Sequence, residues 1–276
     1  MKRSLTILAT AVAAGALLLS ACSAKPSSSA SNSSGVTLIT PGVLTVCTHL
    51  PFQPMESRDD SGNVVGFDFD LMQLVADNLG ATVSVFETDP DQMSSGSAMI
   101  ANKCDIAAEG MTITPARAQA VSFSIPYFSA SQTLAVPSSS DAKSLSDMSG
   151  KNLGVIASST GYEYANNNQT TYGYNIVQYD DGATLMNSLL SGRSDGILYD
   201  FNYVSLFTQD NPTTKIAQQI DTGEVYGFAC ANTDNGKALT AVVNQVLTTA
   251  NSDGTYLKIF QKWIDPNATS AALPTS

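Results

Sequence analysis

Short apolar runs alternate with amphipathic segments along the chain after about residue 40. The run GVLTVCT (42–48) predicts a buried strand, and the following DFDLMQLVADNLG places apolar residues on one helical stripe that Gly80 closes. Further strands are expected at 81–87 and 104–111, with helical sequence around 97–102 between them. This β-α-β-α-β order implies an α/β fold with a mainly parallel sheet flanked by helices.

The same pattern begins again in the second half of the chain. Strands are predicted at KNLGVIA (151–157), YNIVQYD (174–180) and SDGILYD (194–200), separated by helical segments. A strand at YGFACAN (226–232) follows, and two amphipathic helices end the pattern. Two α/β units of similar construction are therefore expected.

The N-terminus carries the features of an export signal. Lys2 and Arg3 precede an apolar run (5–19) that is too short to span a bilayer comfortably. The run ends in LSAC, which resembles the lipobox of bacterial lipoproteins and implies cleavage after residue 21 and a lipid on Cys22. The alternative is an ordinary signal peptide with a chance cysteine. The Ser-rich segment 22–39 is predicted to be a flexible tether.

Composition narrows the possible functions of the folded body. The formal net charge of -11 argues against nucleic acid and against adhesion to anionic lipid. The sequence has a single histidine, His49, and no CxxC spacing, so neither a zinc site nor a Ser/His/Asp set is expected. No glycine-rich phosphate loop is apparent either. We expect no metal, no cofactor and no enzymatic activity.

The segment EGMTITPAR (109–117) places a cation where an anion is favoured. Thr114 is a good helix N-cap and Pro115 a good first residue, so Arg117 falls in the first turn. The N-H groups of a first turn favour negative charge by roughly 0.3 to 1 kcal/mol. Arg117 is therefore predicted to bind an anion. The alternative is an arginine whose stem packs on the surface while its head is solvated.

Five ordered segments resemble one known family. They are GFDFDLMQLVADNLG, CDIAAEGMTITPARAQAVSFSIPYF, SDMSGKNLGVIASSTGYEYA, GILYDFNYV and DGTYLKIFQKW. The chain is similar over nearly its whole body to extracytoplasmic substrate-binding proteins of polar amino acid ABC transporters, solute-binding protein family 3. The resemblance implies a two-lobed periplasmic-binding-protein fold of type II, whose chain crosses twice between lobes that close on a ligand. Lobe 1 would comprise 40–135 and 225–266, lobe 2 would comprise 136–224, and 267–276 would form a flexible tail.

The resemblance also implies how the ligand's α-carboxylate is held. In the family, the arginine that corresponds to Arg117 binds this carboxylate through two N-H groups of its guanidinium. The hydroxyl of Thr112 and the backbone of Gly110 would add hydrogen bonds. Ser159 and Thr160, at the start of a second helix, would hold its other side. Thr160 and Glu163 have capping-box spacing, so the alternative is a helix cap with no role in binding.

The α-amino group needs an acid, and the resemblance assigns Asp200 to it, with Tyr199 alongside. Asp200 ends a predicted strand, and such ends face the ligand crevice; it could instead cap the following turn. Phe52 matches an aromatic wall of the pocket. His49 stands at a position that is often acidic in the family. Glu109 either faces the ligand or has only a structural role at the end of its strand. The family's second aromatic wall is replaced near Gln92. These departures leave open whether the ligand's side chain is acidic, an amide or basic.

The topology implied by the resemblance suggests a disulfide. The returning strand YGFAC should run antiparallel beside DIAAEG, which would bring Cys230 to the same sheet edge as Cys104. A Cys104 to Cys230 disulfide is therefore expected, with Cys47 as a buried thiol.

The predicted function is high-affinity binding of a polar amino acid and its delivery to an ABC permease with its ATPase. The protein is expected to be a monomer, anchored through Cys22 to the outer face of the bacterial cell membrane. Two alternatives stay open. One is a lipoprotein sensor that hands its closed form to a signalling partner. The other is a dehydratase-like enzyme on the same fold, which would need Glu109 or His49 as a general acid.

Overall fold

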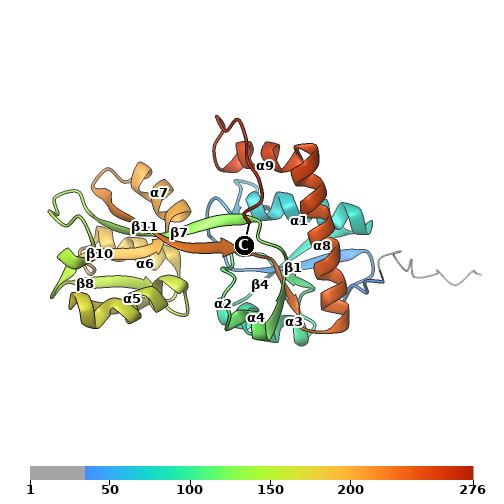
Figure 1. Ribbon diagram of the computed structural model, residues 1–276, viewed down its shortest axis with the longest axis horizontal. Coiled ribbons are helices and arrows are strands. Elements are labelled where there is room, and N and C mark those ends of the chain that lie inside the picture. The colour runs from blue at the N-terminus through green and yellow to red at the C-terminus, as the bar shows by residue number, and fades with distance from the viewer. Residues whose placement is uncertain (1–34, 276) are drawn as a thin grey trace, which may run out of the picture. The chain divides into compact units, whose positions relative to one another are not determined.

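The computed structural model describes residues 35–275, and Figure 1 labels its helices and strands. The predicted signal peptide (1–21) and Cys22 lie outside the described residues, as does most of the tether expected for 22–39. Within the described part of the chain, every helix is too short or too polar to cross a bilayer.

The first sheet has five strands, in the order β4 (Thr82–Glu87), β1 (Val43–Thr48), β5 (Ile106–Ala107), β12 (Ala229–Ala231) and β6 (Val121–Phe123). Strand β1 is parallel to both of its neighbours, as the βαβ order predicts. Strand β12 is antiparallel to β5 and to β6, so the sheet is mixed. The predicted antiparallel return beside β5 is confirmed.

Helices cover both faces of the first sheet. On one face lie α1 (Phe67–Leu79), α8 (Asp234–Asp253) and α9 (Thr255–Trp263), which Figure 1 shows in contact with one another. Helix α1 ends at Gly80 in the left-handed conformation, as predicted. On the other face lie the short helices α2 (Pro90–Ser94) and α3 (Ser97–Ile100).

The second sheet repeats this construction in the order β11 (Thr214–Tyr226), β7 (Phe128–Pro137), β10 (Gly196–Asp200), β8 (Asn152–Ile156) and β9 (Asn175–Tyr179). Strands β10, β8 and β9 are parallel, whereas β7 is antiparallel to both β10 and β11. The remaining elements of this half are η1 (Leu145–Met148), α5 (Thr160–Tyr172), α6 (Gly182–Leu190) and α7 (Phe201–Asp210). A two-stranded sheet of β2 (Ser57–Arg58) and β3 (Val64–Val65) precedes α1.

Two connections link the sheets. The chain leaves the first sheet at the end of β6 and enters the second through β7, and it returns from β11 to β12. Figure 1 shows β7 in green and β11 in orange running alongside each other as an antiparallel pair. The predicted type II fold with two crossovers is therefore confirmed. The boundaries predicted at 135/136 and 224/225 fall inside these two strands.

The predicted Cys104 to Cys230 disulfide is wrong. Cys47 is bonded to Cys104, and Cys230 is a buried free thiol. Side chains alternate between the two faces of a sheet. Cys47 and Cys104 pack with the residues of α2 and α3, whereas Cys230 packs among those of α1 and α8 on the opposite face. The predicted strand pairing is correct, and Cys230 shares the face of its partner Ile106. Cys104 lies before β5, outside the paired residues, and its side chain packs on the other face.

Candidate functional site

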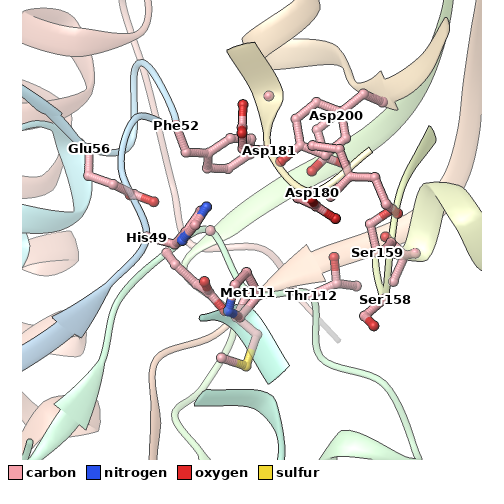
Figure 2. Close-up of a pocket in the computed structure, with 18 of the residues that line it drawn as sticks. His49, Phe52, Glu56, Met111, Thr112, Ser158, Ser159, Asp180, Asp181 and Asp200 are labelled. Atoms are coloured by element: carbon pink, nitrogen blue, oxygen red, sulfur yellow. The ribbon is translucent and has the colours of Figure 1, made fainter. Parts of the chain in front are cut away.

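One cavity is lined from both lobes, and its residues come from the places where strands end (Figure 2). His49 follows β1, Glu109 follows β5, Ser158 follows β8, Asp180 follows β9, and Asp200 is the last residue of β10. These are the carboxyl ends of the parallel strands, where ligands bind in open α/β sheets. All ten predicted ligand contacts line this cavity: His49, Phe52, Glu109, Gly110, Thr112, Arg117, Ser159, Thr160, Tyr199 and Asp200.

Arg117 reaches from the first lobe to the second. Its Nη1 donates to the carbonyl of Thr112 over 3.1 Å, and its Nη2 donates to the carbonyl of Ser158 over 3.1 Å. The helix predicted from Thr114 is assigned only from Arg117 to Ala120, yet Thr114 Oγ1 still accepts from the backbone N-H of Arg117. Arg117 is half-buried, lines the cavity, and its guanidinium is bonded to two backbone carbonyls.

Ser159 caps the second helix, in place of the predicted Thr160. Ser159 Oγ accepts from the backbone N-H of Tyr162 over 3.0 Å and donates to the carbonyl of Ile156 over 2.8 Å. The N-cap therefore lies one residue earlier than predicted, and Thr160 and Glu163 do not form the expected capping box. Because the hydroxyl proton of Ser159 is already used, its side chain is not a free donor.

The backbone and side chain of the 110–112 turn are also engaged. Gly110 has a φ of 57°, and a Cβ there would clash with the ring of Phe52, so glycine is required at this position. The N-H of Gly110 donates to Asp68 Oδ2 over 2.9 Å. The hydroxyl of Thr112 lies 3.4 Å from a carboxylate oxygen of Glu224, to which it donates. Gly110 and Thr112 thus present acceptors more readily than donors.

Asp200 is an almost fully buried acid, with 7% of its surface exposed. Its Oδ1 accepts from Gln132 Nε2 over 2.5 Å. Burial, reinforced by the negative charge of Glu224, raises the pKa of Asp200 to about 7. Asp200 is the N-cap residue of α7, but its side chain makes no capping hydrogen bond.

Aromatic rings from the two lobes meet at the cavity. Phe52 stacks on Tyr203 with ring centroids 5.7 Å apart and contacts the edge of Tyr199 at 5.6 Å. The region near Gln92 contributes only Pro90 to the lining. The second aromatic surface near Phe52 therefore comes from the second lobe.

Acids outnumber cations in the lining. The carboxyl groups belong to Glu56, Glu109, Asp180, Asp181 and Asp200, and the one Lys or Arg in the lining is Arg117. Glu56 is fully buried and neither of its carboxyl oxygens has a hydrogen-bond partner among the described residues. Burial is the main cause that raises the pKa of Glu56 well above its usual value, and burial raises the pKa of Glu109 to about 8 against the opposing effect of Arg117.

The sequence reasoning missed three groups around the site. Glu56 follows a proline and a methionine and gives no periodic signal. Gln132 and Glu224 lie on β7 and β11, neither of which was predicted in full. The pairing of Gln132 with Asp200 across β7 and β10 could have been found only with the strand order in hand.

Two lobes joined by two crossing strands, with acidic and basic side chains lining a shared cavity at the strand ends, define the class of two-lobed solute-binding proteins. The family model for "Bacterial extracellular solute-binding proteins, family 3" matches residues 44–266. The chain belongs to this family.

Related proteins agree on the kind of solute. A "Probable histidine-binding protein" of Neisseria gonorrhoeae is 30% identical over 96% of this chain and 97% of its own length. The "ABC transporter arginine-binding protein 1" of Escherichia coli is 28% identical over 77% of this chain and 86% of its own length. The solved structure of "An ancestral arginine-binding protein bound to arginine" is 34% identical, with a TM-score of 0.76, and covers 81% of this chain and 98% of its own.

These findings establish the general function. The chain is an extracytoplasmic binding protein for polar amino acids that serves an ABC transporter. Its relatives are binding proteins, so the protein is a receptor for its ligand and not an enzyme.

Proposed function

We propose that the protein binds a cationic amino acid, of the arginine, lysine or histidine type. The observation that carries this proposal is the excess of acids in the cavity, whose lining holds five carboxyl groups and one arginine. A zwitterionic backbone uses one acid and one cation, which leaves the remaining acids for the side chain. A positive side chain would compensate them, whereas an acidic one would add to their repulsion.

Arg117 binds the α-carboxylate in this proposal. A guanidinium has five N-H groups, and the carbonyls of Thr112 and Ser158 occupy two of its nitrogens. The first N-H groups of α5, at Thr160 and Gly161, have no partner within the helix and complete this subsite. Ser159 contributes by capping that helix.

Asp200 binds the α-ammonium group. The hydrogen bonds of the site support a change in the roles of two neighbours. Because the N-H of Gly110 is bonded to Asp68 and the hydroxyl of Thr112 to Glu224, the carbonyl of Gly110 and the oxygen of Thr112 are better suited to accept from the ammonium group than to donate to the carboxylate.

Glu109 and Glu56 bind the cationic end of the side chain, with His49 beside them. Figure 2 shows Glu56 and His49 on the side of the cavity opposite Ser158 and Ser159. Phe52 and Tyr199 supply aromatic surface for the stem or for a cation-π contact. A bound cation would favour ionisation of both acids.

The first lobe comprises residues 40–135 and 225–266, and the second comprises residues 136–224. The two lobes close on the ligand. The crossing strands β7 and β11 support this division.

Cys22 carries a lipid that holds the protein at the outer face of the membrane beside its permease. The LSAC sequence supports the anchor, and labelling of the expressed protein with a radioactive fatty acid tests it, with Cys22→Ser as the control.

Calorimetry of the purified protein against each common amino acid tests the proposed ligand class. Arginine, lysine, ornithine or histidine should bind at least tenfold more tightly than glutamine or glutamate. Tightest binding of glutamate or of an apolar amino acid would overturn the proposal.

A further inference from the structure

Glu224 joins three donors that come from three different segments. Its Oε2 accepts from Gln132 Nε2 over 3.0 Å, from Thr160 Oγ1 over 3.1 Å and from Thr112 Oγ1 over 3.4 Å. Thr112 belongs to the turn after β5, Thr160 begins α5, and Gln132 lies in the middle of β7. Glu224 itself lies on β11 behind the cavity and is not part of its lining.

These bonds fix the direction of two hydroxyl groups. A threonine hydroxyl has one proton, and an ionised carboxylate only accepts. Thr112 and Thr160 therefore both point their protons at Glu224. Since both residues also line the cavity, their oxygens offer lone pairs to whatever lies in it.

Gln132 connects Glu224 to Asp200. Its side chain is fully buried, and its Nε2 lies 2.5 Å from Asp200 Oδ1 and 3.0 Å from Glu224 Oε2, with a longer contact of 3.3 Å to Thr160 Oγ1, which keeps a second lone pair for the cavity. An amide NH2 has two protons, so it can satisfy both carboxylates at once, which the amide oxygen could not do. The two acids are thereby held on either side of one amide group.

We propose that Glu224 is a positioning residue that makes the subsite beside Asp200 selective for a free α-amino group. It turns the oxygens of Thr112 and Thr160 towards the ligand as acceptors, and through Gln132 it fixes the carboxylate of Asp200. A ligand ammonium group can donate to three such acceptors, whereas a hydroxyl or hydrogen in its place cannot. This inference rests on the proposed contact of Asp200 with the α-ammonium group.

The test compares two ligands that differ only in that group. Calorimetric or NMR titration measures arginine and 5-guanidinopentanoic acid, which lacks the α-amino group, against the wild type and Glu224→Gln. We expect the substitution to weaken arginine about tenfold to hundredfold, the range for a lost charge-assisted hydrogen bond. Binding of the desamino analogue should change less than about threefold.

Glu163→Gln is the matched control, because it removes the same charge from the exposed first turn of α5. It should leave both ligands within about twofold of the wild type. Equal weakening of the two ligands by Glu224→Gln would indicate a general structural role and overturn the proposal, as would no change in either. If Glu224→Gln does not fold, Thr112→Val and Thr160→Val carry the same comparison, with the same two outcomes.

Failure of the proposed ligand class gives a different result. If the wild type binds glutamine and not arginine, the cationic side-chain subsite is wrong, and the comparison is made with glutamine and glutaramic acid. A selective loss of glutamine binding in Glu224→Gln then still supports the role of Glu224.

Discussion

The guanidinium of Arg117 donates to the backbone carbonyl of Ser158 over 3.1 Å, so a side chain of the first lobe is bonded to a loop of the second. Arg117 Nη1 is held at the same time by the carbonyl of Thr112 in its own lobe. The cation that is proposed to bind the ligand is thus also a contact between the lobes. Binding and lobe closure are expected to be coupled through it.

Replacing Arg117 with alanine should weaken binding of the preferred amino acid by roughly 2 to 5 kcal/mol, or about thirtyfold to several-thousandfold. The reason is that the α-carboxylate would stay desolvated without its partner. Isothermal titration calorimetry measures the change. Arg117→Lys keeps the charge but loses the planar fork, and we expect it to recover only part of the affinity. Unchanged binding by Arg117→Ala would contradict the assignment.

Asp200→Asn should cause a loss of similar size. The amide keeps the shape of the side chain but removes the charge that faces the ammonium group, and its NH2 group would oppose that of Gln132. Asp210→Asn, at the far end of α7, is a suitable control for charge removal. Comparable effects of the two substitutions on calorimetric affinity would argue against a direct contact by Asp200.

Affinity for a cationic ligand should rise with pH between about 6 and 8.5. Burial raises the pKa of Glu109 to about 8 and that of Asp200 to about 7. A cationic ligand prefers the ionised form of both acids. At a pH below their pKa values, each acid must therefore release a proton when the ligand binds. Each released proton lowers the affinity by up to about tenfold for every unit by which the pH falls. Calorimetric titrations in buffers that differ in ionisation enthalpy measure how many protons are released on binding.

Glu109→Gln should flatten this pH dependence, because it removes the carboxyl group whose pKa burial raises to about 8. An affinity that falls as pH rises over this range would contradict the direction derived from burial of the two acids.

The Cys47 to Cys104 disulfide should survive in the non-reduced protein as one linked pair of tryptic peptides, while Cys230 reacts with a thiol reagent only after unfolding. The two cysteines are separated by 57 residues, and closing a loop of this length stabilises a protein by about 4 kcal/mol in the chain-entropy model. The Cys47→Ser, Cys104→Ser double variant should therefore unfold more easily in urea, and Cys230→Ser should show no comparable loss. A linked pair containing Cys230 would contradict this pairing.

The parts of the fold with a clean hydrophobic period were predictable from the sequence. Helix α1 and strand β1 follow such patterns, and both end where their sequence signals indicate. Strand β11 was missed because its sequence, TKIAQQIDTGEVY, mixes polar and apolar residues without a regular alternation. The strand is stabilised by its pairing with β7, and this pairing cannot be read from the sequence of β11 alone.

The site was predictable where a residue follows a strand directly. Asp200 and Arg117 line the cavity as expected, because the strand order and the helix signal near Thr114 both place them there. Gln132 and Glu224 were missed because their partners lie far away in the sequence. The disulfide was predicted wrongly because Cys104 lies before β5, so the alternation of a strand does not give the face to which its side chain points.

A crystal structure of the protein with arginine tests the central claim most directly. The account predicts the guanidinium of Arg117 against the α-carboxylate of the ligand, Asp200 against its α-ammonium group, and Glu109 or Glu56 against its side chain. A cavity in which Arg117 points to solvent, and other groups hold the two ends of the amino acid, would contradict it.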